Sequence, residues 1–347
     1  MRKKKYYISV AFMVLILAAV FMVLFKDQDL DEILHAVKSA DFGYMILAAA
    51  AALLYVIMEG VSMDIILRSL GYLGKMLACI KYSFIGFFFN AVTPSASGGQ
   101  PMQVLYMKEE GINMGEASVT LLFWTIIYKV VLVVVEGLIF IFYRDFAIQH
   151  INGFMWLFIV GLAVNVVSIL LYSIIVFSEN GAKNIAYFAT WCLHKLRLVK
   201  HKEKIEKKLD GMIKAYQEGA VYMRTHLSTT IWVFLATLIQ RISYFAITWF
   251  VYRAMGFDEY SAVQIIILQS FVAVCIDILP MPGGVGANEG FFVALFTPVM
   301  GHSISVSAML LSRGAGFYAL LLVSAAVVVY AQAQSIRRNY KKSRGKV

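Results

Sequence analysis

The sequence TPSASGGQP, at residues 93–101, interrupts an apolar run that extends over residues 76–107. A second apolar run, at residues 262–299, is interrupted by PMPGGVGANEG at residues 280–290. Proline removes a backbone donor and glycine weakens a helix, so neither run is expected to form one continuous helix. Each run is predicted to form two short helices joined at the break.

Six unbroken apolar segments surround the two breaks, and a helix needs roughly 20 apolar residues to cross a bilayer. The segments occupy residues 6–25, 42–67, 117–143, 154–177, 231–252 and 303–332. Of the 347 residues, 61% are hydrophobic and only 15% are charged, a balance outside the usual range of soluble domains. The predicted fold is an all-α integral membrane protein. Its first segment is predicted to be a retained helix, because no small-residue cleavage site precedes Lys26.

The charge of the loops predicts how the chain is oriented. Residues 26–41 carry two lysines against five acidic residues, whereas residues 179–226 carry ten basic residues against five acidic ones. Basic segments stay in the cytoplasm, so residues 179–226 and both basic termini are predicted to lie there. Six crossings agree with this only if each broken run returns to the side from which it enters. The first run then enters from the cytoplasm and the second from outside, as two re-entrant hairpins in an inverted-repeat arrangement.

One polytopic membrane domain is predicted to cover residues 1–347, and it has two halves. Residues 1–178 hold the first hairpin and residues 227–333 hold the second. Residues 179–226 are predicted to form a basic amphipathic connector at the cytoplasmic surface, and residues 334–347 a basic cytoplasmic tail. The net charge of +10 is concentrated beside apolar segments. Anionic lipid headgroups, and not nucleic acid, are therefore the expected partners of these basic clusters.

The two breaks are the predicted binding site, because irregular backbone at membrane depth must be buried in protein or line a polar cavity. A helix that begins after each break would offer N–H groups and the positive end of its dipole to an anion such as phosphate. We therefore expect the breaks to face each other across a hydrophilic cavity near the membrane midplane. The alternative is that they are only tight turns. The residues predicted to bind substrate in the breaks are Ser95, Ser97, Gly98, Gly99, Gln100, Gly283, Gly284, Gly286, Asn288 and Glu289.

Ionisable side chains within apolar segments are costly and usually face the interior of the bundle. Arg241 and Arg313 lie deep in such segments and are predicted to bind a substrate phosphate. Asp277 and Glu289 would additionally suit a headgroup that carries a cationic amino acid.

Two further charged pairs lie within the predicted spans. Lys129 and Glu136 are seven residues apart and thus on one helical face. They are predicted to form either a structural ion pair or part of the substrate path. Asp64 and Arg68, four residues apart near the cytoplasmic end of their segment, are predicted to form an interfacial pair.

The sequence offers no recognisable catalytic or metal-binding motif. Cys79, Cys192 and Cys275 are widely spaced, and the six histidines show no ligand spacing. GxSxG, HExxH and P-loop motifs are absent, which argues against a hydrolase or an ATPase. No catalytic residue, metal or cofactor is expected.

Three motifs in this order resemble the transmembrane domain of the lysylphosphatidylglycerol synthase family. They are SASGGQP after one short apolar helix, PMPGGVGANEG after another, and Arg313-Gly314 followed by Tyr318 in the last span. The resemblance covers nearly the whole chain. It implies a flippase in the bacterial cytoplasmic membrane that moves aminoacylated phosphatidylglycerol, another anionic phospholipid or a polyprenyl-linked lipid between leaflets.

The same resemblance bears on activity and partners. Two-domain members of the family add a soluble transferase domain, whereas this sequence ends at Val347 directly after the basic tail. Aminoacyl transfer is therefore not expected of this chain. A separate synthase and a second copy of the chain are the protein partners that the resemblance allows.

Two alternatives to a flippase stay open. One is the membrane part of a phosphatidylglycerol lysyltransferase system, or an intramembrane enzyme that modifies lipids. The other is a small-solute transporter, which would explain the two re-entrant hairpins equally well.

Overall fold

The computed structural model is helical, and no strand occurs in the part of the chain that it describes. The residues described are 38, 40–73, 75–93, 97–177, 184, 191, 221, 226–277, 284 and 286–343. The predicted first helix, at residues 6–25, lies outside them, and so does nearly all of the predicted connector at residues 179–226.

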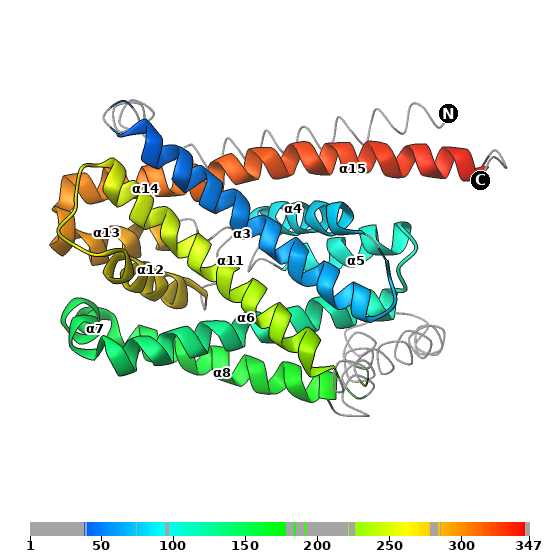
Figure 1. Cartoon of the computed structure of the whole chain (residues 1–347), viewed down its shortest axis with the longest axis horizontal. Coiled ribbons are helices and arrows are strands. Elements are labelled where there is room, and N and C mark those ends of the chain that lie inside the picture. The colour runs from blue at the N-terminus through cyan, green and yellow to red at the C-terminus, as the bar shows by residue number, and fades with distance from the viewer. Residues whose placement is uncertain are drawn as a thin grey trace.

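Two long helices, α3 (Phe42–Ser69) and α11 (Leu227–Ala254), form the centre of the bundle and run antiparallel (Figure 1). Asp41 starts α3, because its carboxylate accepts the backbone N–H groups of Gly43 at 2.8 Å and Tyr44 at 3.2 Å. The N–H of Asp41 itself donates to the carbonyl of Ala254 at 2.9 Å. The start of α3 and the end of α11 therefore meet at one end of the bundle, here called the Asp41 end. The opposite end, where α3 finishes, is the Ser69 end.

Three further spans pack beside this pair. Helix α6 (Met114–Phe142) and helix α8 (Met155–Phe177) are joined at the Asp41 end by α7 (Arg144–Ile151) and the short η2 (Asn152–Phe154). The last span is one continuous helix built from α14 (His302–Arg313), a π-helical turn η4 (Gly314–Tyr318) and α15 (Ala319–Ser343). Within the described residues, five helices are long and apolar enough to cross a membrane. They confirm five of the six predicted spans.

Both broken runs form pairs of short helices, as predicted. The first pair is α4 (Met76–Val92) and α5 (Gly99–Glu109), and the second is α12 (Ala262–Asp277) and α13 (Ala287–Met300). In Figure 1, α4 and α5 lie toward the Ser69 end, whereas α12 and α13 lie toward the Asp41 end. The two hairpins therefore enter the bundle from opposite ends, which is the arrangement that the loop charges predict.

The outer surface of the bundle is apolar. On α8, for example, Trp156 is 67% exposed and Leu170 is 58% exposed. Such side chains would be costly in water, whereas a bilayer solvates them. Inside, small residues let helices approach closely: a Cβ on Gly60 of α3 would lie 2.7 Å from the Cα of Ile80 on α4. The protein is an all-α integral membrane protein.

A polar cluster at the Ser69 end ties the first hairpin to the last helix. Glu110 follows α5, and its carboxylate accepts hydrogen bonds from Lys81 and from Tyr82, the latter at 2.7 Å. Arg338 of α15 adds an ion pair with Glu110 at 3.1 Å. Because α4, α5 and α15 meet at one carboxylate, this cluster should stabilise the base of the first hairpin.

The Glu110 cluster is expected to make stability depend on pH. Burial by itself would raise the pKa of Glu110, but hydrogen bonds from Lys81 and Tyr82 and the nearby positive charges outweigh it and lower the pKa. A carboxyl with a lowered folded-state pKa stabilises the fold above its unfolded pKa of about 4.3, and this contribution is lost as the pH falls through the folded-state pKa. Glu110→Gln should lower the thermal midpoint in detergent at about pH 7, and the difference from wild type should shrink as the pH is lowered below about 4. A difference that stays constant over this range would contradict the assignment.

Candidate functional site

A cavity of about 200 Å³ lies where the second hairpin meets α3, α4, α6, α11, the end of α14 and the π-helical turn η4. Both arginines that the sequence analysis favoured, Arg241 and Arg313, line it. The second hairpin contributes Asp277, Gly284 and Asn288, which were also predicted. The complete lining is Tyr55, Phe87, Tyr128, Arg241, Tyr244, Ala273, Ile276, Asp277, Gly284, Asn288, Arg313, Gly316 and Phe317.

Arg241 is a buried cation that lacks a carboxylate partner in the described part of the chain. Its side chain comes from the middle of α11 and the residue is only 4% exposed. One guanidinium nitrogen donates to the hydroxyl of Tyr128, whose ring centroid lies 4.2 Å from the guanidinium carbon. The Nε atom is buried and has no hydrogen-bond partner among the described residues, and the ion pairs found there all involve other side chains. A buried charge in this state favours an anionic ligand.

Arg313, in contrast, is already compensated. Its Nε donates to Glu289 at 2.9 Å, and the other oxygen of Glu289 accepts the N–H of Gly286 at 2.6 Å. Gly286 has φ = +87°, a conformation that glycine adopts without strain, and it starts α13. Glu289 thus closes the first turn of α13 and holds Arg313 at the same time. The guanidinium also stacks on Phe317 at 4.1 Å, one turn further along the last span.

Lys129 and Glu136 do not pair with each other among the described side chains. Lys129 forms an ion pair with Asp277 at 3.2 Å and donates to Asn165 of α8 at 2.8 Å. Glu136 is fully buried beside Ser270 of α12 and forms no ion pair with a described side chain. The reason is geometric: seven residues span about 10 Å along a helix axis, so the two side chains serve different neighbours. The predicted Asp64–Arg68 pair does form, at 2.6 Å.

No described residue of the first break lines the cavity, although Phe87 of α4 does. The backbone N–H groups of Gly98 and Gly99 donate to the side chains of Thr93 and Asn90, each at 2.9 Å. Gly99 approaches so closely that a Cβ there would lie 2.3 Å from Asn90 Oδ1. These two N–H donors at the start of α5 are therefore satisfied within the hairpin. Two predicted residues, Ser95 and Gly283, lie outside the described residues.

The two hairpins nevertheless meet the same helix at neighbouring positions. Gln100, at the start of α5, donates to Thr125 of α6 at 2.7 Å. Asp277, at the end of α12, pairs with Lys129 one turn further along α6. Residues beside the two breaks thus contact α6 one turn apart, while the cavity belongs mainly to the second hairpin. That the two breaks face each other stays a prediction.

Sequence reasoning missed the aromatic wall of the cavity. Tyr55, Tyr128 and Tyr244 come from three different helices, and the rings of Tyr55 and Tyr244 lie 5.1 Å apart. A tyrosine in the middle of an apolar span is the one local signal that could have marked them, since a phenol needs a polar neighbour in a membrane. In the described residues, no group of three His, Cys, Asp or Glu side chains could hold a metal ion.

Apolar spans, two hairpins that enter from opposite ends and a buried polar cavity define a multi-pass membrane protein. More narrowly, the chain belongs to the family described as the lysylphosphatidylglycerol synthase TM region, whose model matches residues 8–324. This confirms the resemblance drawn from the sequence motifs.

Two curated relatives are similar over most of their length. A UPF0104 membrane protein of Pyrococcus horikoshii is 23% identical over 327 residues, which cover 91% of this chain and 96% of that protein. A UPF0104 membrane protein of Archaeoglobus fulgidus is 22% identical over 297 residues, which cover 82% of this chain and 85% of that protein.

Proposed function

We propose that this chain is a lipid flippase that moves a lipid with an anionic headgroup, either a phospholipid or a polyprenyl-linked lipid, between the two membrane leaflets. The observation that carries the proposal is Arg241, a buried cation at the wall of a cavity with no carboxylate partner among the described residues. An anionic phosphate would supply the missing countercharge and accept hydrogen bonds from the guanidinium. Membership of the lysylphosphatidylglycerol synthase TM family supports a lipid as the source of that phosphate.

The charges around the cavity suit one phosphate group. Arg313 is neutralised by Glu289, and Lys129 by Asp277. Arg241 alone is left to balance a ligand. A phosphodiester carries one negative charge, so its headgroup would match the single positive charge on the cavity wall that no described ion pair compensates.

The hairpins supply the elements that would move. Each hairpin extends only part of the way through the bundle, and the two hairpins enter from different ends. In transporters with inverted repeats, pairs of interrupted helices of this kind surround sites near the membrane midplane. In this proposal the headgroup passes through the cavity while the acyl or prenyl chains remain in lipid. The Ser69 end, where α15 finishes in basic residues such as Arg337 and Arg338, would face the cytoplasm. Anionic lipids would contact these basic residues.

Leaflet exchange in proteoliposomes tests the proposal. The full chain is reconstituted into phosphatidylcholine vesicles with a trace of fluorescent-acyl phosphatidylglycerol, and an impermeant reductant bleaches the outer leaflet. Empty vesicles should lose about half of the fluorescence, since only one of two leaflets is accessible. Vesicles that hold the protein should lose nearly all of it. Bleaching that stops at the level of empty vesicles would overturn the flippase proposal, and the same cavity would then be tested with small anions, as expected of a solute transporter.

A further inference from the structure

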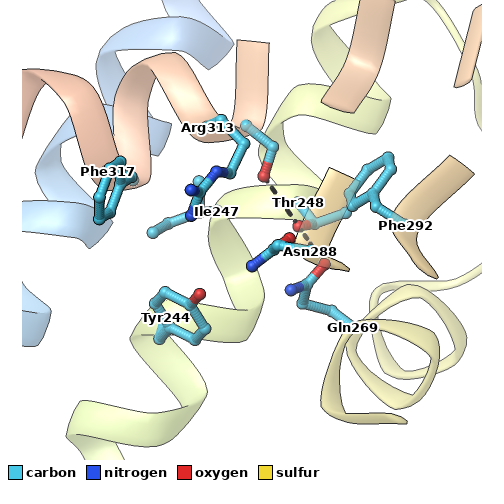
Figure 2. A pocket seen from close by; sticks show the side chains of 10 residues that line it. Tyr244, Ile247, Thr248, Gln269, Asn288, Phe292, Arg313 and Phe317 are labelled. Atoms are coloured by element: carbon cyan, nitrogen blue, oxygen red, sulfur yellow. Dashed lines mark hydrogen bonds between the residues drawn. The ribbon is translucent and has the colours of Figure 1, made fainter. Parts of the chain in front are cut away.

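A small polar recess opens beside the main cavity (Figure 2). Its volume is about 20 Å³, enough for one water-sized group. Tyr244, Asn288 and Arg313 line both the recess and the main cavity. A ligand whose phosphate lies near Arg241 could therefore extend a single small group into the recess.

The recess is lined by hydrogen-bonding groups that are only partly used. Thr248 donates to Gln269 Oε1 at 2.9 Å, and its oxygen lies 3.1 Å from the hydroxyl of Ser312. Since the Thr248 proton is committed to Gln269, Ser312 is the donor in that second contact and keeps its lone pairs. Gln269 and Asn288 are 4% and 7% exposed. Within the described residues, no hydrogen bond involves the Gln269 amide nitrogen or either end of the Asn288 amide.

This set of groups matches a hydroxyl. Asn288 lies next to Thr248 and Gln269 in Figure 2 and offers one acceptor and two donor positions. A hydroxyl both donates and accepts, so it could bind Asn288 or Ser312 and Gln269 together. The amide atoms of Gln269 and Asn288 are not among the fully buried atoms without a partner, so a group that enters the recess could form hydrogen bonds with them.

An ammonium group would fit the recess poorly. Arg313 already places a positive charge at its wall, and the two nearby carboxylates are engaged, Glu289 by Arg313 and Asp277 by Lys129. The adjoining stretches outside the described residues, 278–283 and 285, contain no acidic residue in their sequence. A second cation would therefore be desolvated beside Arg313 without a carboxylate among the described residues that line the recess.

We propose that the recess of Thr248, Gln269, Asn288 and Ser312 binds a terminal hydroxyl of the lipid headgroup. The chain would then select anionic lipids whose phosphodiester ends in a polyol, such as glycerol or a sugar, over those that end in an alkyl or amino group. This inference rests on the proposed function, because it assumes that a lipid phosphate occupies the main cavity. An aminoacylated headgroup, which the sequence analysis included, is disfavoured by the same argument.

The test compares two lipids of equal charge. Phosphatidylglycerol and phosphatidylpropanol, with identical fluorescent chains, differ only in the headgroup hydroxyls. The wild-type chain should exchange trace phosphatidylglycerol about three- to tenfold faster, as expected for one buried hydrogen-bonded hydroxyl. Equal exchange rates of the two lipids would overturn the proposal that the recess binds a hydroxyl, but not the flippase proposal. No exchange of either lipid would overturn both proposals. Faster exchange of lysyl-phosphatidylglycerol than of phosphatidylglycerol would overturn the charge argument.

A substitution that keeps the shape of a recess side chain but removes its hydrogen bonds tests whether the recess causes the preference for phosphatidylglycerol. Gln269→Met, at a residue that lines the recess and not the main cavity, should reduce phosphatidylglycerol exchange to the phosphatidylpropanol rate and leave phosphatidylpropanol unchanged. If Gln269→Met does not fold, Thr248→Val provides the same test, because it removes the two hydrogen bonds that orient Gln269 and Ser312. If a folded variant keeps the full preference for phosphatidylglycerol, the recess does not bind the headgroup hydroxyl.

Discussion

Arg241→Gln is expected to slow the exchange of anionic lipid by about 10- to 100-fold, since hydrogen bonds to a charged group contribute about 1.5–3 kcal/mol. The substitution removes the one cavity-lining cation that has no carboxylate partner among the described residues. The rate is measured as the bleaching of fluorescent phosphatidylglycerol in proteoliposomes. Arg241→Lys should fall between wild type and Arg241→Gln, because an ammonium keeps the charge and loses the two-pronged geometry of guanidinium.

Stability separates this effect from a damaged fold. Because Arg241 is buried without an ion pair in the described residues, its neutralisation should leave the thermal midpoint unchanged or raise it. Arg253, on the same helix but in its last turn at the Asp41 end, provides the matched control. Arg253→Gln should exchange lipid at the wild-type rate. Normal exchange in Arg241→Gln, or an equal loss in Arg253→Gln, would refute the role of Arg241.

Glu289→Gln is expected to destabilise the protein by about 3 kcal/mol, the low end of the range for breaking a buried ion pair. The side chains of Arg313 and Glu289 are only 7% and 13% exposed, so the variant leaves a buried guanidinium without its countercharge. It also weakens the hydrogen bond that closes the first turn of α13 at Gly286. The second hairpin should loosen first, and thermal unfolding in detergent measures the loss.

Two comparisons make the Glu289 result specific. Asp64→Asn breaks a pair in which Arg68 is 52% exposed, and it should cost less than about 1 kcal/mol. The double variant Glu289→Gln, Arg313→Gln should recover part of the lost stability, because no buried charge is left unpaired. If Glu289→Gln instead keeps full stability and changes only the headgroup preference, then Glu289 is a ligand of the substrate and not a support of the hairpin.

Several features of the site could be predicted from the sequence. Arg241, Arg313, Asp277 and Asn288 were all named as site residues and all line one cavity. The reason is that a polar or charged side chain in an apolar span is costly in lipid and therefore usually faces the interior of the bundle. The depth of such a side chain in the membrane follows from its position along the span. Residues at the same depth can therefore be identified from the sequence, even when the partner of each cannot.

The pairing of these side chains was less predictable. The sequence placed Lys129 and Glu136 on one face, but Lys129 contacts Asp277, which lies in a hairpin 148 residues away in the chain. Glu289 and Arg313 were named as separate substrate ligands and instead bind each other. A span that is apolar on all sides does not show by its periodicity which face meets which neighbour, because lipid and protein interior are equally apolar.

By itself, the sequence determined where helices stop and how many residues are available to cross the membrane. Proline and glycine act on the local backbone, and the cost of charge in lipid depends on composition, so both effects can be read along the chain. Only the tertiary structure decided that the first break satisfies its own N–H groups through Asn90 and Thr93, and that the second break lines the cavity. The hydrogen bonds of the first break are local, because they join residues five and nine positions apart. The lining of the cavity depends on the rotation and axial offset of packed helices, which are set by contacts between residues far apart in sequence.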